Sequence, residues 1–283
     1  MCDDEIQFLF LDYGSEMFGA GFPGEDSPKV SFPAVVGRPK EADGGKPVVG
    51  EEAQKNKDLM NLECPTRHGA ITNWTDMELI LHHGFEQLQV IPEEHPVLIT
   101  DHSLHTNADR EKLVKMMFET FKVPALYVAD QAVLSLFASG ATDGVVFESD
   151  ADCSAVIPVS EGSVIREAVL SVDKTDMEVD EIAKMINDSI EKCDAAIHSK
   201  LYGNILMPKE STPGLANRLR KELDTLAEGQ TVNVTVPETG CSPWRGGSMI
   251  ASLSTFKQKA INKEKYEEIG PAAVANSFEA VTK

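Results

Sequence analysis

Two short segments of the chain share a plan that suits anion binding, yet both carry charge of the wrong sign. In each, an apolar strand runs into a turn: FLFLDYGSEM at residues 8–17 and VVFESDADCS at residues 145–154. Backbone N–H groups in such turns can hold phosphate when glycine permits a positive φ and no side chain blocks the approach. Carboxylates stand in both turns: Glu16 in the first, and Glu148, Asp150 and Asp152 in the second. Without a bridging divalent cation, each would repel a polyphosphate by on the order of 1 kcal/mol or more.

The alternating carboxylates Glu148, Asp150 and Asp152 resemble the start of a calcium-binding loop. Such a loop also needs a glycine and a distal bidentate glutamate, and neither follows at the required spacing. We therefore expect a solvated acidic turn and no metal site.

The elements that position these turns alternate between strand and helix, which favours an α/β fold. Strands are expected at 6–12, 97–100, 125–128, 145–147 and 155–159. Helices are expected after a cap at Asn73, after a cap near Asn107, and at 131–138, 179–190, 215–226 and 244–256. The apolar stripes of these helices are interpreted as core.

The composition fits a globular protein with one large or two modest domains: 283 residues, 42% hydrophobic and 25% charged. A formal net charge of −20 disfavours nucleic acid and anionic membranes as partners and favours basic protein segments. The five cysteines are scattered and lack metal-site spacing, which predicts reduced thiols. An acidic N-terminal segment and the lack of a membrane-length apolar run lead us to expect a soluble intracellular protein.

Longer runs of the sequence resemble actin, and they occur in the same order as in that family. They are FP at 32–33, VVGRP at 35–39, HG at 68–69, TNW at 72–74, PEEHPVL at 92–98, MFETF at 117–121, QAVLSL at 131–136, Trp244, GGS at 246–248 and ASLSTF at 251–256. The resemblance implies an actin-like fold of duplicated, ribonuclease H-like α/β domains. The first domain is expected at residues 1–138 plus 244–283, with a reduced second subdomain at about 33–68, and a truncated second domain at 139–243.

Two departures from the family shorten the chain. Between Asp173 and Ser189 the family carries a long segment that this sequence lacks. The resemblance implies that most of the fourth subdomain, with part of the adenine clamp, is missing. A second gap within 41–49 shortens the loop that in the family reaches the next filament subunit.

In the family the two turns bind ATP with its magnesium ion. The matching positions that keep their character here are Asp12, Gly14, Ser15, Gln131, Glu148 and Ser149. Tyr13 and Glu16 replace an asparagine and a glycine, and Gly19 replaces a phosphate-binding lysine. We expect a degenerate, empty nucleotide site with no catalytic residue and no cofactor, in which Tyr13 fills part of the cleft. Gln131 is interpreted as a helix-start residue, and binding of ATP and magnesium is the disfavoured alternative.

The resemblance also implies a partner-binding groove at the barbed end. Its residues would be Phe137, Gly140, Thr142, Gly162, Ile250, Leu253, Thr255 and Phe256. Such an apolar lining suits a helix in a groove. The alternative is that these residues only pack the two subdomains together.

These implications predict a non-enzymatic actin-related protein of the cytoplasm and cytoskeleton. It would terminate an actin or actin-related filament at the pointed end, or serve as a fixed part of a larger assembly. One alternative is a subunit that grips an amphipathic helix in a cytoskeletal, ciliary or chromatin-remodelling complex. The other is a divergent, ATP-binding actin that polymerises.

Overall fold

The computed structural model describes residues 7–40, 45–149, 152–207, 213–236, 243–253 and 256–275. Its backbone contacts divide the chain into two compact units. Unit 1 consists of Met1–Asp101, His105–Ala129 and Gly247–Phe278, and unit 2 of His102–Leu104, Asp130–Gly246 and Glu279–Lys283. Each unit is described by itself.

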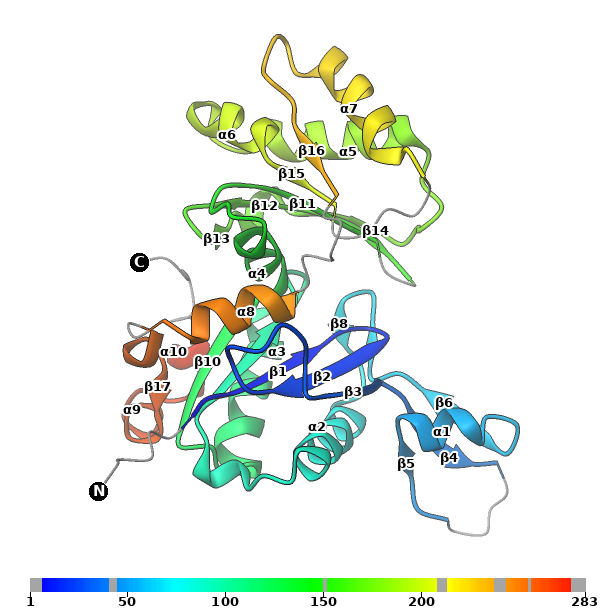
Figure 1. Ribbon diagram of the computed structural model, residues 1–283, viewed down its shortest axis with the longest axis vertical. Coiled ribbons are helices and arrows are strands. Elements are labelled where there is room, and N and C mark those ends of the chain that lie inside the picture. Colours follow the sequence, from blue (N-terminus) through cyan, green and yellow to red (C-terminus); the bar gives the residue numbers. More distant parts are fainter. Residues whose placement is uncertain are drawn as a thin grey trace. The chain divides into compact units, whose positions relative to one another are not determined.

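Unit 1 is built on a six-stranded sheet in the order β17-β10-β9-β1-β2-β3 (Figure 1). The strands are β1 (Leu9–Tyr13), β2 (Met17–Gly21), β3 (Val30–Pro33), β9 (Val97–Asp101), β10 (Ala125–Asp130) and β17 (Ile261–Asn262). Strand β1 pairs antiparallel with β2 and parallel with β9. The hairpin of β1 and β2 therefore contains the first of the two turns.

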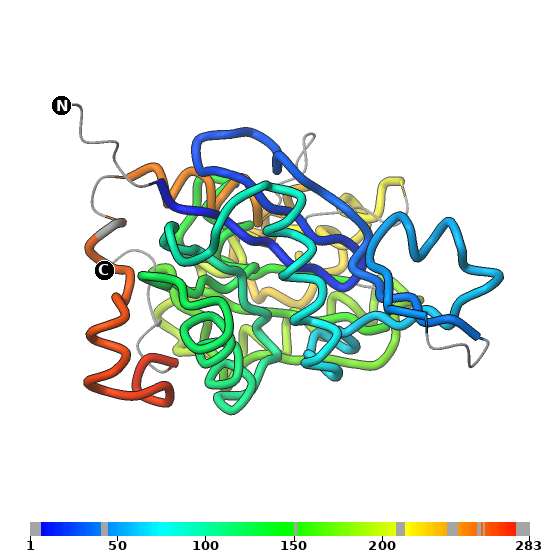
Figure 2. The backbone as a smooth tube through the Cα atoms, turned by 90° about the horizontal axis from the view of Figure 1, so that it is seen from below, coloured from blue at the N-terminus to red at the C-terminus, as the bar shows by residue number. Residues whose placement is uncertain are grey.

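Helices and a smaller sheet complete unit 1. The helices are α2 (Trp74–Leu88), α3 (Asn107–Lys115) with a π-helical turn (Met116–Thr120), α9 (Lys263–Ile269) and α10 (Pro271–Ala275). The smaller sheet has the order β5-β4-β6, formed by β4 (Val36–Pro39), β5 (Val48–Val49) and β6 (Met60–Glu63) beside α1 (Glu51–Lys55). Figure 2 shows this blue and cyan part extending away from the large sheet of its unit. A two-stranded hairpin follows, of β7 (Thr66–Arg67) and β8 (Ala70–Ile71).

Alternation along β1 explains how its sheet is buried on both faces. Leu9, Leu11 and Tyr13 belong to the core that includes Met77 of α2. Phe10 points to the opposite face, where its ring lies under Gly247 of α8 (Pro243–Ala251). Successive strand residues face opposite sides, so a continuous apolar run is what a strand covered on both faces requires.

Unit 2 repeats this plan with a sheet in the order β13-β12-β11-β15-β16, and β14 pairs with β12. Its strands are β11 (Gly144–Ser149), β12 (Ser154–Ser160), β13 (Ser163–Val164), β14 (Leu170–Val172), β15 (Ile205–Leu206) and β16 (Val234–Thr235). Its helices are α4 (Gln131–Ala138), α5 (Val179–Glu191), α6 (His198–Gly203) and α7 (Leu215–Leu226). Val145 and Phe147 pack in the core with α5 and α7, whereas Val146 packs with α4. The second turn lies between β11 and β12.

Two consecutive glycines in α8 serve different units. A Cβ atom at Gly246 would lie 1.9 Å from the carbonyl oxygen of Leu134 in unit 2. One at Gly247 would lie 2.3 Å from the ring of Phe10 in unit 1. The division between the units falls between these two residues, so each glycine permits a close approach that any larger residue would block.

Several expected elements are confirmed, and some boundaries are corrected. Asn73 caps α2 by accepting a hydrogen bond from the Asp76 N–H at 3.1 Å, and α4 spans the predicted residues. The cap of α3 is Thr106, whose side chain accepts from the Asp109 N–H while Asp109 bonds back. Leu226, expected in the core, is exposed.

The expected helix at 244–256 ends at Ala251. The hydroxyl of Ser252 bonds to the Ser248 carbonyl at 2.7 Å, and the Leu253 N–H bonds to the Ile250 carbonyl at 3.0 Å. Serine hydroxyls that bond to backbone carbonyls compete with helix continuation, and a 3₁₀ turn (Phe256–Gln258) follows.

Candidate functional site

The first turn closes with hydrogen bonds from its own chain. Tyr13 ends β1, and its N–H donates to the Thr100 hydroxyl at 3.1 Å. The Gly14 N–H donates to the Met17 carbonyl at 2.8 Å. Ser15 is half-buried and Glu16 is exposed, so the carboxylate of Glu16 stands on the solvent side of the turn.

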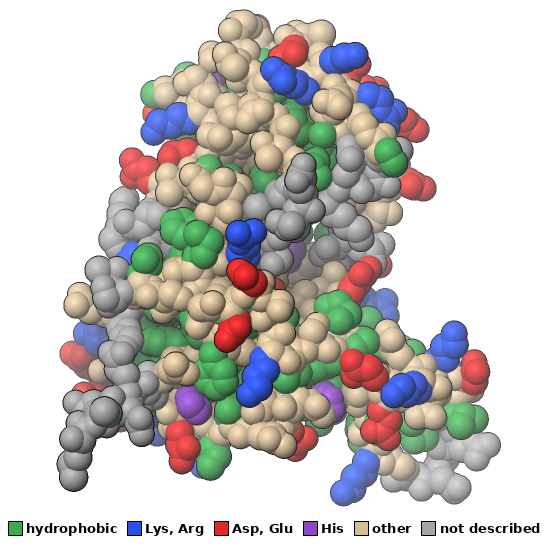
Figure 3. Space-filling model, in the orientation of Figure 1, with side chains coloured by type: hydrophobic (Ala, Val, Ile, Leu, Met, Phe, Trp, Pro, Cys, Tyr) green, Lys and Arg blue, Asp and Glu red, His purple; other side chains and the backbone are tan. Residues whose placement is uncertain are grey.

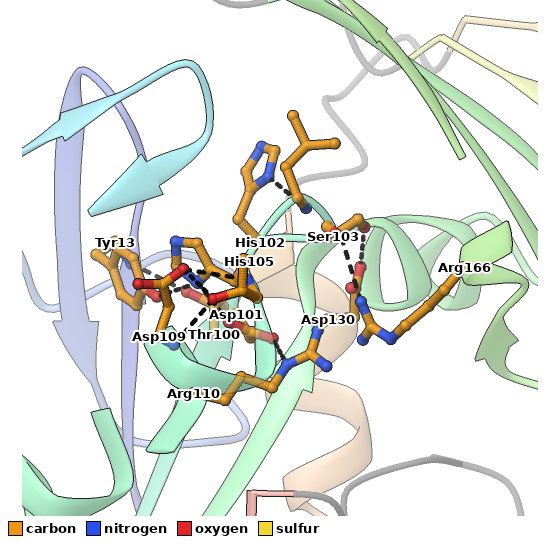
Figure 4. A network of polar contacts seen from close by, with 12 residues as sticks. Tyr13, Thr100, Asp101, His102, Ser103, His105, Asp109, Arg110, Asp130 and Arg166 are labelled. Atoms are coloured by element: carbon orange, nitrogen blue, oxygen red, sulfur yellow. Dashed lines mark hydrogen bonds and ion pairs between the residues drawn. The ribbon is translucent and has the colours of Figure 1, made fainter. Parts of the chain in front are cut away.

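Tyr13 is buried in the core of unit 1, with 3% of its surface exposed. Its ring stacks on His105 with 6.2 Å between ring centroids, and its hydroxyl lies 3.5 Å from His105 Nδ1 (Figure 4). His105 Nδ1 lies 2.6 Å from a carboxylate oxygen of Asp101, and Arg110 Nε donates to the other oxygen. We call Tyr13, Asp101, His105 and Arg110 the Tyr13 network.

The side chains of the Tyr13 network are held away from water. The side chains of Asp101, His105 and Arg110 are between 1% and 9% exposed. Burial alone would raise the pKa of Asp101, but the hydrogen bond from His105 and the charge of Arg110 outweigh it and lower that pKa. Burial, reinforced by Asp101, raises the pKa of Tyr13 well above its ordinary value. Asp101 is thus ionised and Tyr13 neutral at pH 7.

The second turn is built differently. Strands β11 and β12 stay paired out to Ser149 and Ser154, whose hydroxyls lie 3.1 Å apart. Asp152 is exposed, and Asp150 and Ala151 lie outside the described residues. Glu148 is half-buried, and its carboxylate lies 3.8 Å from His102 Nε2. The acidic turn and the absence of a metal site therefore stay predictions.

A second polar cluster lies in unit 2 and surrounds the short segment His102–Leu104. The Ser103 hydroxyl donates to Asp130 at 2.7 Å, and the same carboxylate oxygen caps α4 by accepting from the Ala132 N–H at 3.0 Å. Arg166 donates to the Ser103 carbonyl at 3.2 Å (Figure 4). Gln131 is the first residue of α4, as predicted, and it is buried.

Sequence reasoning missed both histidines of these clusters. No role was assigned to His102 or His105 from the sequence, and both are buried. Tyr13 and His105 are 92 positions apart, so no local pattern joins them. The available signal was the spacing of Asp101, His105 and Arg110 beyond a buried strand, where a carboxylate needs a partner.

The residues of the expected groove fall in both units. In unit 2, Phe137 is half-buried, Gly140 and Thr142 are exposed, and Gly162 is buried. The Gly162 N–H donates to the Thr142 carbonyl at 2.9 Å, which joins the two loops that carry them. Asp143 extends this link by accepting from the Ser160 hydroxyl at 2.9 Å.

In unit 1 the expected groove residues divide into core and surface. Ile250 and Phe256 are buried, and the Phe256 ring lies 5.1 Å from that of Phe8. Leu253 is 51% exposed. Met249, which was not among the predicted groove residues, is 45% exposed. Thr255 lies outside the described residues. Among the described residues at this end of α8, Met249 and Leu253 offer apolar surface to a partner.

The rest of the described surface is mixed. Figure 3 shows acidic and basic side chains interspersed over one face. No helix within the described ranges is long and apolar enough to cross a membrane. Cys64 is exposed and Cys153 and Cys193 are buried, whereas Cys2 and Cys241 lie outside the described residues.

Comparison with known families agrees with the two-unit α/β architecture. The family model described as Actin matches the chain in two segments, at residues 3–175 and 171–279. The segments overlap at residues 171–175, at the end of β14 and the start of its connection to α5, close to where the sequence places the missing stretch. Together they cover nearly the whole chain, and the chain therefore belongs to the actin family.

Proposed function

We propose that this actin-family chain is non-enzymatic and acts by binding other proteins. The observation that carries the proposal is the buried Tyr13 network at the first turn. In the family, this turn and the bound nucleotide order one another. Here an aromatic ring and three polar or charged side chains of the same chain supply that order, which removes the need for a ligand.

The donor set around the first turn does not suit a triphosphate. The Tyr13 and Gly14 N–H groups are used within the chain, and no lysine follows because Gly19 occupies that position. A Cβ at Gly19 would already lie 3.2 Å from the Pro28 ring. The exposed carboxylate of Glu16 adds repulsion. We therefore propose that ATP and magnesium are not cofactors of this chain.

Thermal unfolding with and without nucleotide tests this point. Millimolar ATP with magnesium is expected to shift the melting temperature by less than about 1 °C, because a ligand stabilises only the state that it binds. Phosphate release should stay at the level of a protein-free control. A saturable shift of several degrees, or release above that background, would show that the proposal is wrong.

The proposed binding surface includes Met249 and Leu253 at the end of α8. Large apolar side chains that remain half exposed suit a protein interface, and the neighbouring Ile250 and Phe256 already fill the core. The matching surface of actin, at the barbed end, accepts neighbouring subunits and helices. We propose that it docks on the exposed pointed end of an actin or actin-related filament in the cytoskeleton.

A chain that binds through one face and cannot present the other would terminate growth. The shortened pointed-end region supports this polarity, because the missing stretch would build most of the fourth subdomain. Seeded actin growth, with the barbed ends blocked, should slow as the protein is added. Unchanged growth at saturating protein would reject the capping role.

Two matched variants test which surface binds. Leu253→Asp places a charge on the proposed surface and should abolish the effect. Leu59→Asp makes the same change at a residue beside β6 that is 71% exposed, and should leave the effect unchanged. The opposite pattern would place the contact on the small sheet β5-β4-β6 instead.

A further inference from the structure

The sequence Thr-Asp-Met-Glu occurs twice in this chain, at 75–78 and at 175–178. In both copies acidic residues follow the threonine at the first and third positions. This is the charge pattern that acid-directed protein kinases read with a basic substrate groove. The tetrapeptides are identical, so any difference between them as kinase substrates must come from the structure or from the residues that flank them.

The second copy lies in an exposed segment without regular structure. Residues 173–178 connect β14 to α5, and Lys174, Thr175, Asp176 and Glu178 are all exposed. Asp180 and Glu181 follow in the first turn of α5 and add carboxylates beyond the motif. Glu178 is also the cap of α5, and its N–H donates to Glu181 at 2.9 Å. Its side chain is exposed, so a kinase groove could take up residues 173–177 and contact the Glu178 carboxylate while α5 stays in place.

The first copy is held in a helix: Thr75 is exposed, but the two residues after it are buried. Thr75 lies in the first turn of α2, after the cap Asn73. Asp76 is fully buried and bonded by both terminal nitrogens of the Arg38 guanidinium, and Met77 is in the core. A kinase could read this copy only if the start of α2 unwound and the ion pair broke.

We propose that Thr175 is a phosphorylation site for an acid-directed serine/threonine kinase and that Thr75 is not. The Thr175 hydroxyl would attack the γ-phosphorus of ATP bound to the kinase, forming the Oγ–P bond as the bond to ADP breaks. A carboxylate of the kinase accepts the hydroxyl proton. This inference is independent of the function proposed above, because the nucleotide belongs to the kinase.

Other hydroxyls with an acidic residue three positions later lie in regular elements or are engaged in local bonds. Thr235, three positions before Glu238, is the last residue of β16. Thr106 caps α3. The Thr225 hydroxyl donates to the Glu222 carbonyl at 2.6 Å, and the Ser149 hydroxyl pairs with that of Ser154. In contrast, Thr175 lies next to Lys174, whose ammonium bonds both carboxylate oxygens of Glu181 at 2.8 and 2.6 Å. A phosphate of about −1.5 to −2 charge would compete with Glu181 for that ammonium.

The test is phosphorylation of the native full chain by a purified kinase of the casein-kinase type, with radiolabelled ATP and mass-spectrometric mapping. Thr175 should be modified to near completion, at an initial rate roughly 100-fold above that at Thr75, because a misplaced acceptor loses that much or more. Thr175→Val should abolish most incorporation, and Thr75→Val should leave it unchanged. Glu178→Gln, which removes the third-position charge, should lower the rate about tenfold.

Two results would overturn the proposal. One is no incorporation at Thr175 in the native chain. The other is equal incorporation at the two threonines. A nitrogen-15 spectrum of the modified chain gives an independent readout: the amides of Lys174 and Glu178 should shift while those of α2 stay in place.

Discussion

The two turns follow one plan, strand, turn and antiparallel strand beside a parallel neighbour, yet their surroundings differ. The first is closed over a buried aromatic ring and a buried ion pair. The second ends in paired serine hydroxyls and an exposed Asp152. A duplicated fold thus keeps its backbone plan in both halves while each half changes its turn by a different route. The first turn is tied to the stability of its unit, and we expect the second to be free to vary.

The largest expected effect comes from breaking the Tyr13 network at its charge. Asp101→Asn leaves Arg110 buried without its counter-charge and should lower the free energy of unfolding by about 3–5 kcal/mol. Urea unfolding measures the loss of unfolding free energy, and faster amide hydrogen exchange in β1 and β9 would locate the destabilised region. Asp58→Asn, the same change at an exposed carboxylate of unit 1, is the control. An equal loss in both variants would contradict the assigned role of the buried pair.

Removing the ring should rank second. Tyr13→Ala deletes a buried aromatic side chain and should cost about 3 kcal/mol. Tyr13→Phe keeps the ring and loses only a hydroxyl that lies 3.5 Å from His105, so its cost should stay below about 1 kcal/mol. Urea midpoints of the two variants measure the difference. Equal destabilisation would assign the order of the turn to the hydroxyl rather than to the packed ring.

Lowering the pH should remove the contribution of the ionised Asp101 carboxylate to the free energy of unfolding. Its pKa is lowered in the folded chain, so its stabilisation is complete above the ordinary value of about 3.9 and is lost as the pH falls below it. The difference in unfolding free energy between wild type and Asp101→Asn should therefore be constant near pH 7 and shrink below about pH 4. Unfolding curves across that range measure it. A difference that grows with acid would reverse the sign and refute the assignment.

The smallest effect is expected at the second turn. Asp152→Asn changes an exposed side chain and should alter the unfolding free energy by no more than about 0.5 kcal/mol. The same measurement that detects Asp101→Asn serves here. A loss of 2 kcal/mol or more, roughly the level of a buried polar group, would show that the second turn also carries a structural network and would remove the contrast.

Local patterns predicted the fold well because they report local physics. Asn73 before an apolar stripe predicted the cap of α2, and 131–138 predicted α4. The predicted end of α8 was several residues too late, because the apolar spacing continues past Ala251. The Ser252 hydroxyl donates a hydrogen bond to the Ser248 carbonyl, which competes with continuation of the helix. The Tyr13 network was not predicted as a unit, because it joins the ends of β1 and β9 to the segment that leads into α3 and to α3 itself. Tertiary contacts of that kind leave no periodicity.

The glycine pair in α8 has a consequence for mutational tolerance. In a saturation-mutagenesis library of this chain, we expect every substitution at positions 246 and 247, alanine included, to be depleted after selection for folded protein. The reasons differ between the two positions. At 246 a side chain would clash with the Leu134 carbonyl oxygen of α4, and at 247 it would clash with the ring of the fully buried Phe10. Replacing Phe10 with a smaller residue should therefore make alanine tolerated at position 247, whereas alanine at position 246 should remain depleted.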